Sequence, residues 1–157
     1  RTHFPDLLLK GMYSLKRITT ITIATVAVLL VSSLVLPQMA IAYLDQIIQN
    51  YPDRAPKALL EKSKRLDKMN STKTAAQLRQ LVLTQYANSE AAAEMRWTYA
   101  RDRAKAGDFK LAKQWAEPIL TNNPTSEIAP EAGFWAGKWA QRLNQNDQAA
   151  KIFQKVL

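Results

Sequence analysis

Two tryptophans four residues apart are the side chains best suited to hold a ligand in this sequence. Trp135 and Trp139 share one face of a predicted helix, because residues four apart lie one above the other. Indole rings offer flat apolar faces, which suit stacking against sugar rings. Packing between helices is the expected role of Trp135 and Trp139, and ligand contact is the alternative that makes them candidate ligand-contact residues. Trp97 and Trp115 fall at repeated positions and are predicted to lie in the core.

Four glutamates form two pairs that could resemble a general acid and base. Glu90 and Glu94 share a helix face, and Glu127 and Glu131 repeat that spacing further along the chain. An acid–base pair needs a carboxyl group whose pKa is tuned by its surroundings, usually by burial. Both pairs are predicted on exposed first helical turns, where acidic groups stabilise the helix dipole. The sequence therefore gives no catalytic residue.

Basic residues exceed acidic ones, and the excess continues along the chain. The formal charge is +9, of which residues 43–157 carry +6. The cations crowd two stretches: Lys57, Lys62, Lys64, Arg65, Lys68, Lys73 and Arg79, then Arg96, Arg101, Arg103, Lys105, Lys110 and Lys113. A solvated helix face explains them, and a track for an anionic wall polymer or a membrane surface is the alternative. Nucleic acid is not expected as a partner, because stacking aromatics are not interleaved with these cations.

Several kinds of chemistry are excluded by composition. The chain has no cysteine, so disulfides, thiolate zinc sites and thiol nucleophiles are absent. His3 is the sole histidine, which argues against imidazole metal centres and catalytic triads. The 4 glycines form no phosphate loop or dinucleotide fingerprint. We expect no metal and no cofactor.

The elements that must position these side chains follow a repeat of 37 residues. Large apolar positions recur as large and small positions recur as small, which indicates stacked units that bury one another's apolar faces. The recurring sets are Leu60, Trp97 and Phe134; Ser63, Ala100 and Gly137; Ala75, Ala112 and Ala149; Leu78, Trp115 and Ile152; Val82, Ile119 and Val156; and Leu83, Leu120 and Leu157.

Each unit is predicted to contain two helices joined by a short break. The first helices span about 57–68, 90–106 and 130–143, and the second span about 74–86, 109–122 and 147–157. Ser89, Asp108 and Ser126 are expected to cap helices, and Gly107 to end one. The run 43–51 matches the end of a second helix. The fold class is therefore all-α: an α-solenoid of antiparallel helix pairs with a period of about 37, after an N-terminal apolar helix.

The N-terminal part has the pattern of an export signal. Lys16 and Arg17 precede nineteen uncharged residues, 18–36, and Ala40-Ile41-Ala42 forms a small–x–small site for cleavage. Residues 12–42 are thus a signal peptide or, if uncleaved, a membrane anchor through residues 18–36. Residues 1–11 precede a suitable initiator Met and are interpreted as a non-native or upstream leader. Residues 43–157, the helical-repeat domain, are expected in the periplasm, free or anchored to the inner membrane.

The repeats resemble the tetratricopeptide pattern. Gly107-Asp108-Phe109 opens a second helix, Ala112 follows, and Pro124 comes twelve residues after Ala112, as that family expects. The period is 37 where the family has 34, and the aromatic residue of the second helix is displaced to Trp115. The resemblance implies helical pairs with a concave groove.

A narrower resemblance covers residues 43–157. The segments Trp115-Ala-Glu-Pro-Ile119, Asn122-Asn-Pro124 and 130–143, with the two tryptophans, are similar to the superhelical region of soluble lytic murein transglycosylases, especially the cyanobacterial type. That family is exported, and its catalytic Glu, followed by Ser, lies in a separate C-terminal domain. No Glu here is followed by Ser. We therefore expect the domain to be truncated before the catalytic one.

The resemblance implies a function for the repeats. They would be the non-catalytic superhelical portion of a cell-wall enzyme, holding or positioning peptidoglycan for a missing catalytic domain. The alternative is a periplasmic adaptor that binds a protein partner in its concave groove.

Overall fold

The computed structural model describes residue 32 and residues 35–156, and within them all regular secondary structure is helical. The prediction of an all-α protein is therefore confirmed for this part of the chain. The chain divides into two compact units, Arg1–Tyr43 and Leu44–Leu157. Residues 35–50 are helical, and the elements that follow are η1 (Pro52–Arg54), α2 (Ala55–Lys68), α3 (Thr72–Gln85), α4 (Glu90–Lys105), α5 (Phe109–Asn122), α6 (Ala129–Arg142) and α7 (Asn146–Gln154).

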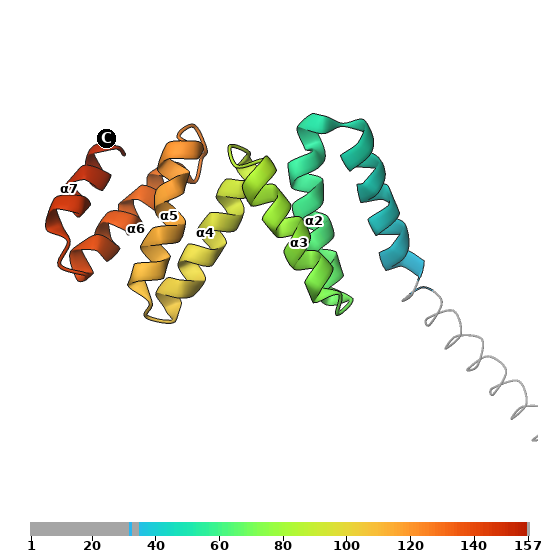
Figure 1. The fold of residues 1–157 in the computed structure, drawn as a ribbon, viewed down its shortest axis with the longest axis horizontal. Coiled ribbons are helices and arrows are strands. Elements are labelled where there is room, and N and C mark those ends of the chain that lie inside the picture. Colours follow the sequence, from blue (N-terminus) through green and yellow to red (C-terminus); the bar gives the residue numbers. More distant parts are fainter. Residues whose placement is uncertain (1–31, 33–34, 157) are drawn as a thin grey trace, which may run out of the picture. The chain divides into compact units, whose positions relative to one another are not determined.

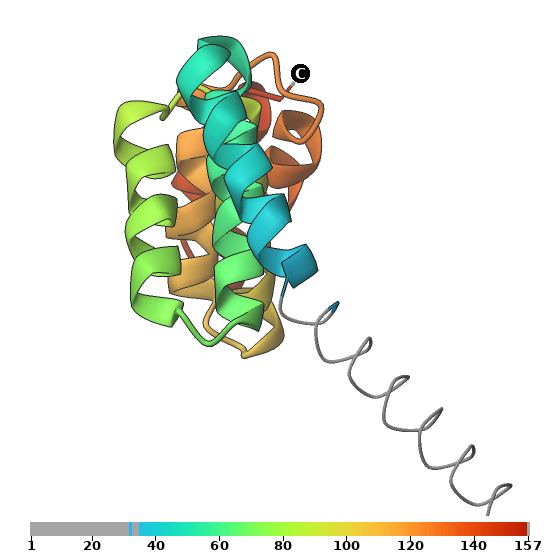
Figure 2. The same cartoon turned by 90° about the vertical axis from the view of Figure 1, so that its right-hand side faces the viewer.

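Consecutive helices of the second unit run antiparallel and pack side by side (Figure 1). The closest packing joins α2 to α3, α4 to α5, α5 to α6, and α6 to α7, and α4 makes smaller contacts with α2 and α3. In the view turned by 90°, the orange and red helices lie behind the green ones (Figure 2). Each helix thus packs chiefly on its neighbours in sequence. The six predicted helices all exist, and each starts within two residues of its predicted start.

Side-chain caps explain where two of the helices begin. Ser89 Oγ accepts a hydrogen bond from the amide of Ala92 at 3.2 Å, and Asp108 Oδ1 accepts one from Leu111 at 3.0 Å. The third predicted cap is wrong. Ser126 Oγ accepts from the amide of Ile128 at 3.1 Å, inside the turn, because α6 starts only at Ala129.

The helix pairs share a backbone feature at the repeat interval. Asn70, Gly107 and Asn144 are spaced 37 residues apart, and all three have positive φ, of 60°, 80° and 58°. Each ends the first helix of a pair and turns the chain into the second. Glycine adopts this left-handed conformation freely, and asparagine is among the few other residues that tolerate it. The turn within the pair is therefore repeated three times with the same backbone geometry.

Small residues bring the helices of each pair together, as predicted. The residues Ser63, Ala100, Ala75, Ala112 and Ala149 are all buried. At Gly137 the ring of Phe153 from α7 takes the space of a side chain, since a Cβ there would clash with the ring atoms.

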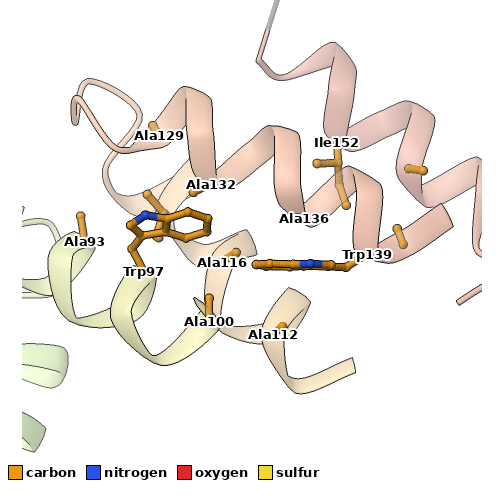
Figure 3. Packing of buried hydrophobic residues seen from close by; sticks show 13 residues of the cluster. Ala93, Trp97, Ala100, Ala112, Ala116, Ala129, Ala132, Ala136, Trp139 and Ile152 are labelled. Carbon is orange, nitrogen blue, oxygen red and sulfur yellow. The ribbon is translucent and has the colours of Figure 1, made fainter. Parts of the chain in front are cut away.

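The buried apolar residues form two clusters, and both include α4. The larger joins α4 to α5, α6 and α7 around Trp97 and Trp139, whose rings lie among alanines from three helices (Figure 3). The smaller joins α4 to α2 and α3 through Leu59, Val82 and Met95, with Ile48 packed against it. Helix α4 is thus apolar on two sides and is shared by both clusters.

A buried arginine ties the start of α4 to the end of α5. Arg96 Nη1 donates to the carbonyl of Ala87 at 2.8 Å and to Asn123 Oδ1 at 3.0 Å. Asn123 Nδ2 in turn donates to the carbonyl of Ser89 at 2.9 Å. Burial lowers the pKa of the Arg96 guanidinium from its ordinary value, and the hydrogen bonds keep this desolvated cation satisfied.

Most of the predicted signal peptide or anchor, and residues 1–11, lie outside the described residues. Pro37 falls within the helical residues 35–50. No helix among residues 35–156 has the length and apolar character that a bilayer crossing requires.

Candidate ligand-binding groove

A groove of about 400 Å³ opens between α4 and α6. Its floor and walls are mainly aromatic, and charged side chains lie along its rim. The lining residues are Trp97, Arg101, Ala104, Lys105, Phe109, Glu131, Trp135, Trp139 and Arg142. Pockets that hold small ligands are typically apolar with a few polar groups at set positions, which is the composition found here.

Helix α6 contributes one continuous stripe of side chains to the groove. Glu131, Trp135, Trp139 and Arg142 lie four, four and three residues apart, which places them along a single face. Glu131 belongs to the first turn of α6 and Arg142 to the last. The stripe therefore has a carboxylate at one end, two indoles in the middle and a guanidinium at the other end.

The two tryptophans of the stripe are covered to different extents. Trp139 is 4% exposed and stacks at 6.0 Å, between ring centroids, on Trp97 of α4. Trp135 is 42% exposed and stacks at 6.3 Å on Trp139. The buried rings thus support Trp135 from below and leave part of it open to a ligand. Because packing already restricts the side chain of Trp135 in the free protein, binding a ligand need not cost further rotamer entropy.

Cations approach the aromatic walls from both helices. The guanidinium of Arg101 lies 5.7 Å from the Trp97 ring centroid, and that of Arg142 lies 4.7 Å from the Phe109 ring centroid. Such cation–π contacts hold a guanidinium over a ring while leaving its N–H groups free to bind a ligand. Both arginines and Lys105 are exposed.

A second groove, of about 300 Å³, lies one repeat earlier between α2 and α4. Its residues correspond to those of the first groove at an offset of 37: Leu60 to Trp97, Lys64 to Arg101, Glu94 to Glu131, and Thr98 to Trp135. The aromatic rings of the first groove are therefore replaced by an aliphatic side chain and a small hydroxyl.

The charges of the second groove are paired with one another. Lys64 Nζ lies 2.9 Å from both Glu61 Oε1 and Glu94 Oε1, and Arg79 pairs with Asp67. Burial would lower the pKa of Lys64, but the hydrogen bonds to the two glutamates outweigh it and raise that pKa above 10.5. Both cations of this groove are therefore ion-paired, and the ring in its lining is that of Tyr99, which is partly buried and packs on Trp115.

The structure brings both candidate ligand-contact residues into the groove, with Trp135 exposed and Trp139 buried. Trp97 is buried, as predicted, whereas Trp115 is only partly buried and packs at 4.9 Å on Tyr99. Sequence reasoning missed Phe109 and Arg142 as parts of the site. Residue 142 could have been found, because it continues the stripe of Glu131, Trp135 and Trp139.

The four glutamates do not form acid–base pairs. Glu90 Oε1 accepts a hydrogen bond from Ser126 Oγ at 2.8 Å, and Glu94 is paired with Lys64. Glu127 is exposed in the turn before α6, outside the helix start to which it was assigned, and Glu131 stands on the groove rim.

The basic residues do not form one uninterrupted track. Lys62 is paired with Asp45, and Arg96 is buried. Lys113 is also buried, where it donates to Gln145 Oε1 at 2.7 Å and to Gln148 Oε1 at 2.6 Å. Of the cations that line the two grooves, Lys64 and Arg79 are ion-paired, whereas Arg101, Lys105 and Arg142 have no ion pair within residues 35–156.

Within the described residues, no group of three or more acidic, histidine or cysteine side chains converges on a metal position. No protein-family model matches the chain, and no curated protein matches it. Function is therefore inferred from the groove and the helices around it.

Proposed function

We propose that this chain is a non-catalytic binding module whose groove holds a glycan. In this proposal the helix pairs form a tetratricopeptide-like α-solenoid, the superhelical portion of an exported lytic transglycosylase-like cell-wall enzyme. The module would hold or position peptidoglycan for a catalytic domain. The observation that carries the proposal is the half-exposed Trp135, stacked on the buried Trp139 in a groove of about 400 Å³.

Two features support a repeated, ligand-holding architecture. The left-handed residues Asn70, Gly107 and Asn144 recur at the interval of 37, so the turn geometry repeats along with the side chains. The two grooves also occur at equivalent positions of successive units. Stacked repeats commonly use such extended concave surfaces to bind polymers or peptides.

The groove itself is built for binding. Glu131 is its one carboxylate, it is exposed, and no second acid or nucleophile lines the groove beside it. In the resembled family the catalytic Glu is followed by Ser, whereas Glu131 is followed by Ala132, and a glycosidic general acid usually has its pKa tuned by burial. The proposal therefore assigns cleavage to a separate domain.

A protein-binding adaptor is the second candidate. The side chain of Phe134 on α6 is 50% exposed, next to Trp135, with which it makes an edge-to-face contact at 5.6 Å. Exposed aromatic residues are frequent anchors in protein interfaces. A partner using this ring would bind beside the groove, because Phe134 does not line it.

The Trp135→Ala substitution tests the glycan-holding role. We expect the purified chain to co-sediment with peptidoglycan sacculi and the variant to bind about five- to thirtyfold more weakly, since a stacking Trp at a binding hot spot contributes on the order of 1–2 kcal/mol. The dissociation constant from sedimentation at several sacculus concentrations is the measurement. Circular dichroism checks that the fold is kept.

Phe134→Ala is the matched control. It removes a neighbouring aromatic side chain of similar exposure from the same helix without altering the groove lining. Equal losses in the two variants, or no binding by the parent chain, would contradict a glycan-holding groove. Release of muropeptides by the chain alone would contradict its non-catalytic role.

A further inference from the structure

The groove has a direction that its charges define. Glu131 and Arg142 lie at opposite ends of the α6 stripe, eleven residues or about 16 Å apart at 1.5 Å per residue. Two indoles separate them. A ligand lying along the stripe therefore meets a carboxylate at one end and cations at the other.

Helix α4 adds its cations at the same end as Arg142. Helices α4 and α6 run parallel, since α5 is antiparallel to both (Figure 1). Lys105 in the last turn of α4 corresponds to Arg142 in the last turn of α6, at the offset of 37. Arg101 lies one helical turn earlier. The C-terminal ends of both helices favour positive charge, which stabilises Lys105 and Arg142 in the last turns.

These three cations remain unpaired in the described part of the chain. Neither Arg101, Lys105 nor Arg142 has a carboxylate within ion-pair distance among residues 35–156, whereas the corresponding Lys64 of the second groove contacts two glutamates at 2.9 Å. Guanidinium groups bind carboxylates through fixed pairs of N–H donors. The free cations therefore point to an anionic group on the ligand.

We propose that the groove binds an acidic saccharide, with a sugar ring on Trp135 and a carboxylate held by Arg101, Lys105 and Arg142. The inference rests on the glycan-holding function proposed above and adds the class of sugar. Glu131 favours a saccharide over an acidic peptide. Sugar hydroxyls can donate hydrogen bonds to this carboxylate, while a peptide with an acid at every residue would place a like charge against it.

The test compares two tetrasaccharides on the whole chain. One is a hyaluronan tetrasaccharide, in which glucuronate alternates with N-acetylglucosamine, and the other is neutral chitotetraose. We expect the acidic sugar to bind at least tenfold more tightly at low salt, as measured by tryptophan fluorescence and calorimetry. The preference should shrink as salt rises, because exposed charges are screened.

Charge-removing variants locate the carboxylate. We expect Arg142→Gln to weaken binding of the acidic sugar about tenfold and to leave the neutral sugar nearly unchanged. Glu131→Gln should not weaken the acidic sugar. Lys64→Gln removes the same charge one unit earlier, where the cation is already paired, and should have no effect. Lys105 is exposed. The Lys105→Gln substitution therefore provides a second variant if Arg142→Gln fails to fold.

Three outcomes would overturn the inference. Equal affinity for the two sugars, with both lost in Trp135→Ala, would leave the glycan-holding function intact and remove the acid preference. Tetraglutamate binding as tightly as the acidic sugar, with the same loss in Arg142→Gln, would assign the groove to acidic peptides. Failure of the acidic sugar to bind would also reject the inference, and binding to sacculi reports separately on the broader function.

Discussion

The buried polar side chain of Asn123 links two other groups by hydrogen bonds. It accepts a hydrogen bond from the buried Arg96 and donates one to the carbonyl of Ser89, the residue that caps α4. Both partners would otherwise face a dry interior, because Asn123 is only 4% exposed. A buried polar group left without its partner costs more than the bond itself contributes.

Asn123→Ala should lower the free energy of unfolding by about 1–3 kcal/mol, because Arg96 loses an acceptor and Ser89 loses a donor. Urea denaturation followed by circular dichroism measures the change. Asn122→Ala alters the adjacent residue, which is less buried and does not accept the hydrogen bonds of Arg96, and should cost much less. Equal losses in the two variants would show that the bridge is not responsible.

For single residues, the sequence predicted which side chains share a helix face but not which of them are buried. The spacing of Trp135 and Trp139 correctly placed both on one face. It could not distinguish them, because the cover of Trp139 comes from Trp97 on another helix. Phe109 was missed for the same reason, since it reaches the groove from the start of α5.

At the scale of the elements, the turn inside each helix pair depends on one left-handed residue. Gly107 takes φ of 80° with nothing within 4 Å of the position where a Cβ would lie. Space is therefore available, and only the backbone conformation limits the residue type. At the two equivalent positions Asn70 and Asn144 adopt φ of 60° and 58°.

Gly107→Ala should lower the free energy of unfolding by about 1–2 kcal/mol, the usual cost of left-handed backbone for a residue with a Cβ. Gly107→Asn should cost less, because asparagine already occupies the same conformation at the two equivalent turns. Thermal or urea denaturation measures both. If alanine and asparagine proved equally harmful, a contact rather than the dihedral angle would be limiting.

Helix positions were predictable because their signals are local. Apolar periodicity, the caps Ser89 and Asp108, and the stop at Gly107 lie within a few residues of the ends they define. Ser126 was misassigned as a helix cap for an equally local reason. Its hydroxyl closes a turn with Ile128, and the choice between turn and cap depends on the path of the chain through residues 123–129.

For the second unit as a whole, α4 is the link between two apolar clusters. The cluster around Trp97 and Trp139 joins it to three later helices, and the cluster around Leu59 and Val82 joins it to two earlier ones. The earlier side contacts α4 over less of its length. Stability is therefore expected to differ between the two sides, as is common in proteins built from successive units.

The Leu59→Ala substitution should make the two apolar clusters unfold at different urea concentrations. Removing this buried side chain should lower the free energy of unfolding of the smaller cluster by about 2–5 kcal/mol. All four tryptophans lie in α4, α5 and α6, so fluorescence follows the larger cluster while far-ultraviolet circular dichroism follows all helices. We expect the dichroism midpoint to fall well below the fluorescence midpoint. Ile119→Ala, in the larger cluster, should lower the fluorescence midpoint, and coincident curves for Leu59→Ala would refute the separation.

The row of indoles also has an optical consequence. Trp97, Trp139 and Trp135 follow one another at 6.0 and 6.3 Å, with ring planes inclined by 30° and 29°. Transition dipoles this close share absorbed energy, so excitation spreads over three rings instead of staying on one. A molecule that touches only Trp135 then alters the light emitted from rings it never reaches. Binding of a ligand in the groove should therefore be measurable from tryptophan fluorescence without an added dye.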